Sequence, residues 1–341
     1  MTVLHHNKPQ PLNTCPLCGS ISSTVMYHDV PDFKYRVPGK WDFLRCHDCG
    51  LIFLHTIPCK IDIIQPRDYS KHKPPRVPEI KGEGIMAGIK GWIRYGIMWQ
   101  HGYKLAQNPL QKIAGRLLSL FPKIVLKSAW GILLFPKAHY GKTILDVGCG
   151  NGRFLAIMKK LGWNVYGVEP DPISLKISRE IIGNKIHQSL DDMMALDVQF
   201  DVITMNHVLE HIDKPLAILK KCGQMLKPDG CIGICVPNWL SCTHRLFKKY
   251  WHALEPPRHV TMYEPDTLRI LIQRSGFTVT MLETTSIRDG IVPFKKSYKN
   301  RYGRAPSFIL MLMWNIFLML TCFTDKKRGE EILLWGIKSV S

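Results

Sequence analysis

Acidic side chains are scarce in this sequence. Its 341 residues include 27 Asp and Glu against 46 Lys and Arg, a formal net charge of +19. The excess lies in two segments: residues 71–140 have 12 basic and 2 acidic side chains, and residues 285–341 have 10 and 4. Residues 141–284, with 17 and 15, are nearly neutral. The sequence is therefore not uniformly basic, and its charge lies on two flanks of a neutral centre.

An apolar leader is also missing. Residues 1–10 contain neither an apolar stretch nor a small-residue cleavage site, so no secretory signal is predicted. The 11 cysteines include two Cys-x-x-Cys pairs, which in a chain without an export signal indicate metal ligands or redox groups in a reducing compartment. We therefore expect a cytoplasmic protein. With 45% hydrophobic and 21% charged residues, a largely disordered chain is excluded.

Two Cys-x-x-Cys-Gly knuckles stand near the N-terminus. Each can hold two thiolates within about 4 Å of each other, and its glycine permits the turn that aims backbone N–H groups at sulfur. Four thiolates form the closed tetrahedral set typical of structural zinc. We predict a zinc-ribbon-like module over residues 1–65, with a structural Zn²⁺ bound by Cys15, Cys18, Cys46 and Cys49. A redox motif, or His47 in place of one cysteine, is the alternative.

Residues 66–140 are predicted to be a basic, proline-rich linker followed by amphipathic helices. From residue 142 on, short apolar segments alternate with amphipathic ones. The segments that read as strands are 143–147, 164–168, 185–188, 200–205 and 230–236, and those that read as helices are 154–161, 171–182 and 214–226. Strands separated by helices predict an α/β fold, a parallel sheet with helices on both faces.

The loop after the first of these strands lacks the last glycine of the dinucleotide-binding pattern, because position 153 is arginine. Its glycines are instead Gly148, Gly150 and Gly152. Such a loop lets a ligand approach backbone N–H groups at a helix N-terminus. Asp146 stands inside the preceding strand, and Glu169 ends the next strand, where a carboxylate can accept both hydroxyls of a ribose. Because position 153 is arginine and not glycine, a dehydrogenase is disfavoured.

This part of the sequence resembles the class I S-adenosylmethionine-dependent methyltransferases. The resemblance is carried by ILDVGCGNGRFL, VYGVEPDP, FDVITMNHVLEHIDKP and LKPDGCIGICVPN, and at the end by GEEILLWGIK, which is similar to their antiparallel last strand. LEPPRHVTMYEPDTLRILIQRSGF is similar to the branch that modifies glycans, lipids and secondary metabolites, which also has paired Cys-x-x-Cys modules. The resemblance implies a Rossmann-like seven-stranded sheet over residues 141–341, mostly parallel with an antiparallel last strand, and an apolar insertion at about 290–328.

The resemblance also implies the roles of individual residues. S-adenosylmethionine would be bound by Asp146 at its ammonium group, by the three loop glycines under its methionine moiety and by Glu169 at its ribose. Asn206, with His207, would close the far side of the pocket, and Asp191 would bind the adenine amine. Glu210 and His211 fit either the site or a structural role in the loop after the fourth strand.

Methyl transfer from a sulfonium is an in-line displacement, and a hydroxyl acceptor also benefits from a base. The candidate bases are His259 and His207, with Tyr263 close by; His211 and His252 also fall near the expected cleft. Each of these histidines is equally explained as a satisfied loop or core residue.

The uncharged run 305–324 is long enough as a helix, about 30 Å, to cross a bilayer. A single crossing conflicts with the return of residues 331–338 to the sheet. The run is therefore expected to lie in the membrane interface, to re-enter as a bent hairpin, or to pack on helices within 85–136. Basic residues among aromatic ones in both flanks predict peripheral attachment to the inner face of an anionic membrane.

These observations predict an S-adenosylmethionine-dependent methyltransferase that methylates an oxygen of a glycan, lipid-linked or secondary-metabolite acceptor at a membrane surface. The alternatives are an RNA-binding, RNA-modifying methyltransferase and a non-catalytic partner with the same fold. Nucleic acid is disfavoured because the central segment is nearly neutral and has no aromatic stacking platform or basic recognition helix.

Overall fold

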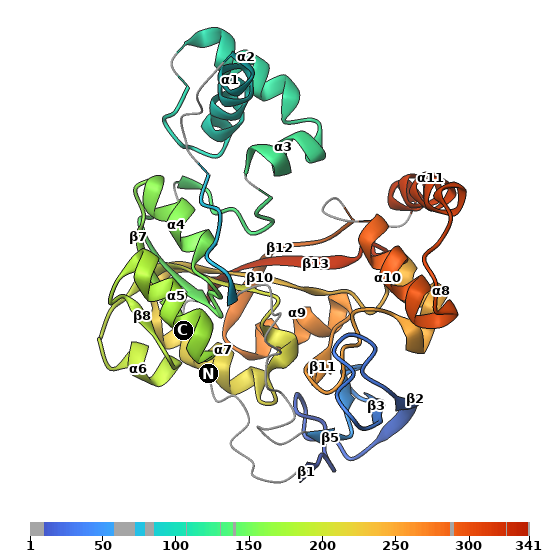
Figure 1. Cartoon of the computed structure of the whole chain (residues 1–341). Coiled ribbons are helices and arrows are strands. Elements are labelled where there is room, and N and C mark those ends of the chain that lie inside the picture. Colours follow the sequence, from blue (N-terminus) through green and yellow to red (C-terminus); the bar gives the residue numbers. More distant parts are fainter. Residues whose placement is uncertain are drawn as a thin grey trace.

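A computed structural model describes residues 10–57, 72–78, 85–106, 108–129, 131–138, 141–286, 290–324 and 326–339 (Figure 1). Its centre is a seven-stranded sheet in the order β12-β13-β10-β9-β6-β7-β8. The strands are β6 (Thr143–Val147), β7 (Asn164–Val168), β8 (Ile186–His187), β9 (Phe200–Asn206), β10 (Leu226–Pro237), β12 (Phe277–Thr285) and β13 (Glu331–Lys338). Among these described strands, β13 runs antiparallel to both of its neighbours, β10 and β12, and all other neighbouring pairs are parallel. The predicted Rossmann-like methyltransferase sheet is confirmed.

Helices cover both faces of this sheet, as the alternating pattern predicts. They are α4 (Arg153–Lys160), α5 (Pro172–Ile182), α6 (Leu190–Met194), α7 (Pro215–Met225) and α9 (Pro265–Arg274). Alternate residues of β6 point to opposite layers: Ile144 is buried among side chains of α4 and α5, whereas Leu145 is buried among those of α6, α7 and α9. Because both faces are covered, the parallel strands are apolar along nearly their whole length.

The cysteine-rich N-terminal segment forms a second sheet with part of the C-terminal half. Strands β2 (Ser23–Val30), β3 (Trp41–Cys46) and β4 (Ile52–Leu54) are followed in the sheet by β11 (Thr261–Met262), in the order β11-β4-β3-β2. A shorter pair joins β1 (Gln10–Pro11) to β5 (Thr56–Ile57). Between the two knuckles, β2 and β3 pair as an antiparallel hairpin. Residues 10–57 are thus built into the same structure as the loop that precedes α9.

A buried ion pair fastens the two parts together. Arg258 donates from both terminal nitrogens to the carboxylate of Asp32, at 2.9 and 3.1 Å, and both side chains are almost fully buried. Lys34 pairs with Glu255 at 2.8 Å nearby. These contacts join segments more than 200 residues apart and fix residues 32–35 against the loop that contains Arg258.

Three helices form a subdomain above the sheet in Figure 1: α1 (Ile85–Gln100), α2 (Pro109–Leu118) and α3 (Pro122–Ser128). The first two helices cross at glycine: a Cβ on Gly96 would lie 2.1 Å from the Gln111 carbonyl oxygen. These three helices lie within the segment 66–140. Residues 58–65 of the predicted zinc-binding module lie outside the described residues, as do residues 66–71 and 79–84 of the predicted linker and Trp130.

The apolar run forms one continuous helix, α11 (Phe308–Thr324), after α10 (Ile291–Tyr302). Trp314 of α11 stacks on Phe294 of α10, with ring centroids 4.7 Å apart. Figure 1 shows α11 beside α10 and well separated from α1–α3. Two of the three alternatives for this run are therefore wrong: it is not a bent hairpin, since α11 is one continuous helix, and it does not pack on α1–α3, because α10 supplies its apolar contact. Among the described residues, no helix is both long and apolar enough to cross a membrane.

Candidate active site

A cavity of about 340 Å³ lies at the carboxyl ends of β6, β7 and β9, where parallel sheets of this kind bind ligands. Of the residues predicted to bind the cofactor, five line it: Asp146, Gly148, Gly150, Glu169 and Asn206. Thr204 donates to Asp146 at 2.7 Å, and the Gly150 N–H donates to Glu169 at 2.7 Å. Both carboxylates are nearly buried and held in place by neighbours.

The glycines of this loop are required by its backbone. Gly148, Gly150 and Gly152 have φ angles of 72°, 56° and 76°, which side chains disfavour. A Cβ on Gly148 would also lie 2.5 Å from Cγ2 of Val208. Glycine at position 148 therefore lets the loop approach the segment after β9 more closely than any other residue would permit.

Two of the predicted cofactor residues lie elsewhere. Gly152 is the left-handed residue at the start of α4 and is not among the lining residues. Asp191 is exposed on α6 and pairs with Lys221, outside the cavity lining. Ser189 and Asp192 form a capping box at the start of α6, and of the two residues between them Leu190 is buried whereas Asp191 faces solvent. Its role toward adenine stays a prediction without support from this lining.

Two further segments contribute to the surroundings of this cavity, one by lining it and one by contacting the glycine loop. Residues 131–134, after α3, line one side of it. Residues 72–78 run along the glycine loop: the Asn151 amide donates to the Lys73 carbonyl at 2.9 Å, and His72 pairs with Asp171. Neither segment has a local signal, because its contacts are made with residues far away in the sequence.

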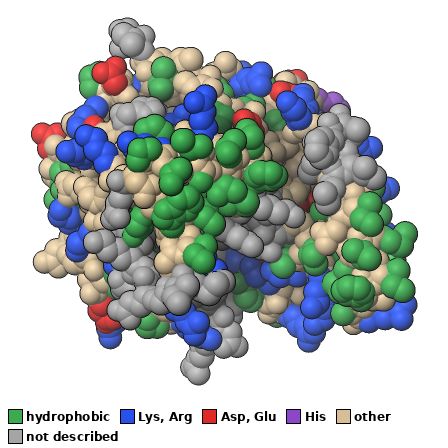
Figure 2. Space-filling view, turned by 90° about the horizontal axis from the view of Figure 1, so that it is seen from above, with side chains coloured by type: hydrophobic (Ala, Val, Ile, Leu, Met, Phe, Trp, Pro, Cys, Tyr) green, Lys and Arg blue, Asp and Glu red, His purple; other side chains and the backbone are tan. Residues whose placement is uncertain are grey.

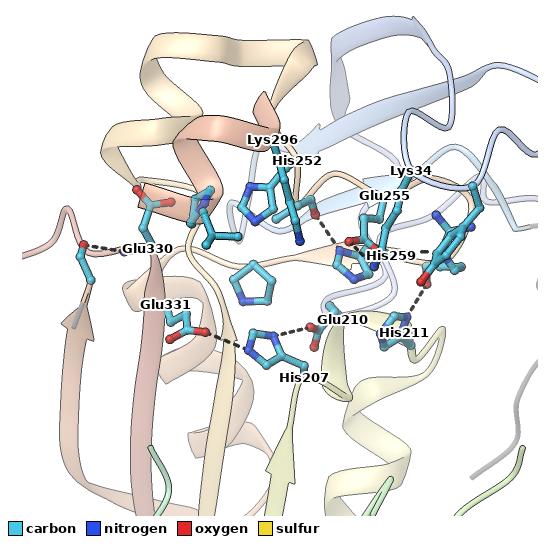
Figure 3. Close-up of a pocket in the computed structure, with 17 residues that line it drawn as sticks. Lys34, His207, Glu210, His211, His252, Glu255, His259, Lys296, Glu330 and Glu331 are labelled. Carbon is cyan, nitrogen blue, oxygen red and sulfur yellow. Dashed lines mark hydrogen bonds and ion pairs between the residues drawn. The ribbon is translucent and has the colours of Figure 1, made fainter. Parts of the chain in front are cut away.

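A second cavity of about 350 Å³ opens beside the first (Figure 3). Its lining joins distant parts of the chain, among them Lys34 and Tyr35, residues between 207 and 211, residues between 252 and 259, residues between 292 and 296, and Glu330 with Glu331. His207 lines both cavities. His207, directly after β9, therefore lies in the wall that the two cavities share.

His207 is held as a cation between two carboxylates. Its Nδ1 lies 3.2 Å from Glu210 and its Nε2 3.0 Å from Glu331 (Figure 3). Burial opposes the charge, but Cys235 and the two carboxylates hold the pKa of His207 well above its ordinary value. Since both ring nitrogens then donate, this histidine has no lone pair with which to remove a proton. Its left-handed φ of 55° further indicates a constrained position.

His259 has the opposite character. It is buried, and its Nδ1–H donates to the Ala253 carbonyl at 2.6 Å, which leaves the lone pair on Nε2. Burial and the neighbouring His211 keep the pKa of His259 well below its ordinary value. Of the two candidate bases, His259 is therefore the one in the protonation state that accepts a hydrogen.

The other side chains near the expected cleft differ in access. Tyr263 is fully buried, shares a hydrogen bond with Thr261 and does not line the cavity. His252 lines it, and burial lowers the pKa of His252 to about 3. Lys34 and Glu331, which sequence reasoning missed, line it as well. They come from opposite ends of the chain, so only the fold brings them to the histidines.

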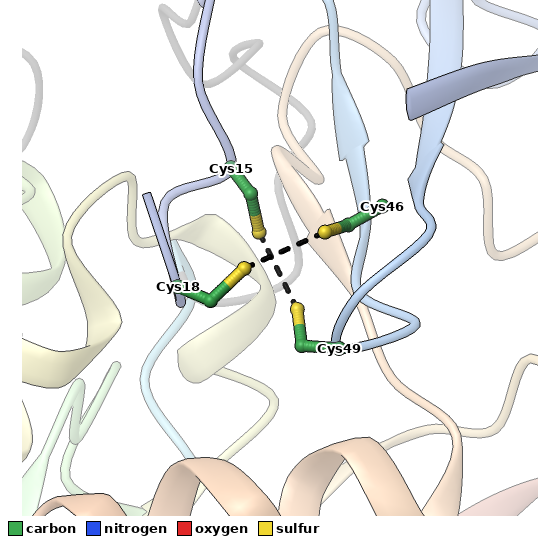
Figure 4. Close-up of side chains that lie close together, drawn as sticks. All are labelled: Cys15, Cys18, Cys46 and Cys49. Atoms are coloured by element: carbon green, nitrogen blue, oxygen red, sulfur yellow. Dashed lines mark hydrogen bonds between the residues drawn. The ribbon is translucent and has the colours of Figure 1, made fainter. Parts of the chain in front are cut away.

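The four knuckle cysteines converge at one point (Figure 4). Sγ of Cys15 lies 3.5 Å from that of Cys49, and Sγ of Cys18 lies 3.5 Å from that of Cys46. All four sulfur atoms lie within 4.8 Å of one another, and three of the cysteines are buried. Hydrogen bonds from the Cys49 thiol and backbone N–H groups lower the pKa of Cys15 to about 5. Such a set of thiols fits a closed metal site of the kind zinc occupies.

The sheet order and the glycine loop now have a counterpart among known proteins. Residues 124–282 match the family model described as "Methyltransferase domain". This segment is a class I S-adenosylmethionine-dependent methyltransferase domain. The methyltransferase domain includes six of the seven strands of the central sheet in whole or in part, and β13 completes the sheet.

The methyltransferase domain also has curated relatives. A "Ubiquinone biosynthesis O-methyltransferase" of Roseobacter denitrificans is 31% identical over 162 residues, which are 42% of this chain and 63% of that protein. One of Actinobacillus pleuropneumoniae is 34% identical over 122 residues, 33% of this chain and 50% of that protein. The chain thus spans about half the length of the curated relatives it matches.

Solved structures similar to this chain include a "SAM dependent methyltransferase" of Archaeoglobus fulgidus, at 18% identity and a TM-score of 0.41, covering 72% of this chain and 100% of that one. Another is the magnesium protoporphyrin IX methyltransferase of Synechocystis with bound SAH, at 15% identity and a TM-score of 0.39, covering 76% and 91%.

Proposed function

We propose that the protein transfers a methyl group from S-adenosylmethionine to an oxygen atom of a small acceptor. The observation that supports this most is the meeting of the two cavities at His207, with the cofactor residues on one side and His259 on the other. Asp146 and Glu169 would hold the cofactor, which supplies an electrophilic methyl group when bound. The names of the curated O-methyltransferase relatives agree with an oxygen acceptor.

We call the second cavity, which is lined by His259 and His211, the acceptor cavity; it is suited to a polar group of the acceptor. Its hydroxyl can donate to Nε2 of His259, which positions the oxygen and draws the proton away as the new bond to carbon forms. The imidazolium of His207, between the two cavities, stays protonated and shapes the passage between them. A further hollow of about 460 Å³ continues from this cavity and is lined by Arg36, Lys296 and Lys299 among others. These cations favour an acceptor that also has an anionic group, as lipid-linked glycans do.

Replacing His259 with glutamine is expected to lower the rate of methyl transfer by about 10²–10⁴-fold, the usual value of a positioned proton acceptor. The affinity for S-adenosylmethionine should change less than about twofold, because His259 does not line the cofactor cavity. Labelled methyl transfer into an extract of envelope lipids and glycans, together with equilibrium binding of the cofactor, measures both. A normal rate in this variant would remove His259 from the mechanism.

We further propose that the enzyme works at a membrane surface. Seen from above, two apolar patches lie on the same side of the molecule, one over α2 and one over α11 (Figure 2). The exposed side chains of the first are Leu110, Ile113, Leu117, Leu120 and Phe121, and those of the second are Phe308, Ile309, Leu310, Leu312, Met313, Ile316 and Phe317. Lys and Arg side chains border part of each patch (Figure 2), which suits an anionic leaflet.

Changing Ile309 and Met313 to lysine is expected to weaken binding to phosphatidylglycerol vesicles by more than about tenfold. Each side chain is more than 60% exposed, and burying it in lipid is worth roughly 1.5–3 kcal/mol. Ile21→Lys is the matched control, because Ile21 is also exposed but belongs to the zinc-ribbon-like module. Vesicle sedimentation measures binding; equal loss in both variants, or no binding by the unaltered protein, contradicts the proposal.

A structural Zn²⁺ at the four cysteines is also proposed. It would hold the turns on either side of the β2–β3 hairpin, and so support residues 32–35 at the acceptor cavity.

A further inference from the structure

Glu210, His211 and His259 form a compact group in the wall of the acceptor cavity. One possible ligand atom from each lies within 4.8 Å of the others. Glu210 and His211 belong to the short 3₁₀ turn Leu209–His211, and His259 lies in the loop before β11. The Val260 N–H donates to the Glu210 carbonyl at 2.8 Å, which fixes these two segments against each other. All three side chains line the cavity (Figure 3).

Both histidines are oriented in the same way. The Nδ1–H of His211 donates to the Arg258 carbonyl at 2.9 Å, and that of His259 donates to the Ala253 carbonyl at 2.6 Å. Each ring therefore presents the lone pair of Nε2. Metal-binding histidines almost always have this arrangement, with the distal N–H held by a carbonyl or carboxylate.

The carboxylate of Glu210 adds an independent observation. It is fully buried, and its Oε2 has no hydrogen-bond partner among the described residues. A buried carboxylate oxygen without a partner costs free energy unless something else satisfies it. Its other oxygen accepts from His207, and Figure 3 shows Glu210 between His207 and His211.

We propose that Glu210, His211 and His259 bind a divalent transition-metal cation in the acceptor cavity. Two imidazole nitrogens and one carboxylate form the ligand set of catalytic metal sites that keep a position open, and here that position faces the cavity. Bonds of about 2.0–2.2 Å require ligand atoms roughly 3–3.5 Å apart, so the three side chains draw together slightly on binding. The inference rests on the proposed function and deepens it.

The cation would activate the acceptor oxygen. Bound at the open position, the hydroxyl has a lowered pKa and loses its proton to water in the cavity. Its oxygen then forms the new bond to the methyl carbon while the carbon–sulfur bond breaks, and the sulfonium becomes a neutral thioether. When the cation is bound, Nε2 of His259 is one of its ligands, so the acceptor oxygen is positioned by its bond to the metal in place of a hydrogen bond to His259.

The neighbouring group of His207, Cys235 and Glu331 also brings possible ligand atoms within 4.8 Å. It is not the site, because both ring nitrogens of His207 donate to carboxylates and neither has a lone pair for a metal. Those two hydrogen bonds instead help to orient Glu210 toward the proposed cation.

Cobalt titration of the full-length protein tests the site. After a mild chelator has removed weakly held metal, Co²⁺ should bind with visible d–d absorption and without a thiolate-to-cobalt charge-transfer band, because this site has no sulfur. Glu210→Gln and His259→Gln should each lower that affinity by more than the roughly 10–100-fold that loss of an outer hydrogen-bond partner costs. His28→Gln, an exposed histidine of β2, is the control and should leave it unchanged.

The unaltered protein decides the matter even if a variant fails to fold. Absence of a cobalt spectrum without sulfur character, or an undiminished one in folded Glu210→Gln, overturns the metal site. Methyl transfer measured in parallel separates the two proposals. Transfer that continues unchanged without metal overturns the cation's role and leaves the proposed function. Cobalt bound at this site without transfer to any acceptor supports the metal site and contradicts the proposed function.

Discussion

Gly148→Ala is expected to reduce the affinity for S-adenosylmethionine by about 100-fold, or ~2.8 kcal/mol. Two effects combine at this position. The left-handed φ of 72° costs an alanine about 1–2 kcal/mol, and the added Cβ would lie 2.5 Å from Cγ2 of Val208. To relieve this clash, the glycine loop or the segment of Val208 must move. The glycine loop lines the cofactor cavity, and the segment of Val208 lies between His207 and Glu210, which line the acceptor cavity. Isothermal titration with the cofactor measures the loss.

Gly162→Ala is the matched control. Gly162 also has a left-handed φ, of 90°, but a Cβ there meets nothing within 4 Å. Gly162→Ala should therefore lower only the stability of the fold, by the free energy of placing alanine in a left-handed conformation, and leave the affinity for S-adenosylmethionine unchanged. If both variants bind the cofactor as the unaltered protein does, the cavity below Gly148 is not the cofactor site.

Arg258→Met is expected to lower the free energy of unfolding by about 3–5 kcal/mol, because it leaves the Asp32 carboxylate buried without its charged partner. Desolvation of Asp32 is offset first by the hydrogen bonds and charge of Arg258, which keep the pKa of Asp32 below its ordinary value. Urea unfolding at an unchanged m-value measures the loss. Since Lys34 and Tyr35 follow Asp32 and line the acceptor cavity, methyl transfer should fall as well.

Lys327→Met provides the comparison for this ion pair. Its partner is Asp266, and both side chains are more than half exposed, so the expected cost is below about 1 kcal/mol. Adding Asp32→Asn to Arg258→Met should recover part of the stability, because the buried charge is then gone. Equal small effects at both ion pairs would mean that the zinc-ribbon-like module is not fastened through Arg258.

The sequence predicts most of the central sheet because its signals are local. A parallel strand buried on both faces is a short apolar run, and each helix between strands repeats its apolar positions at helical spacing. The same holds for the cysteine cluster, where each knuckle is complete within five residues. Local patterns left open where the run 305–324 packs, because its neighbour α10 is recognised only in the fold, where Trp314 stacks on Phe294.

The acceptor side of the site was largely beyond prediction. The charge of His207 depends on Glu331, which lies 124 residues later, and residues 34 and 35 reach the site through an ion pair that spans 226 residues. No spacing in the sequence marks such contacts. For Asp191 no comparable signal was available: the capping box of Ser189 and Asp192 marks the start of α6, but of the two residues between them Leu190 is buried and Asp191 is exposed.

Mass spectrometry after incubation with deuterium-labelled S-adenosylmethionine tests the central claim most directly. The purified protein is mixed with the cofactor and an extract of envelope lipids and glycans. We predict that one species gains a labelled methyl group in place of a hydrogen with the unaltered protein, and that Gly148→Ala greatly reduces this product. If the protein binds the cofactor and no species in the extract gains the label, the account of this protein as a methyltransferase acting on such acceptors is contradicted.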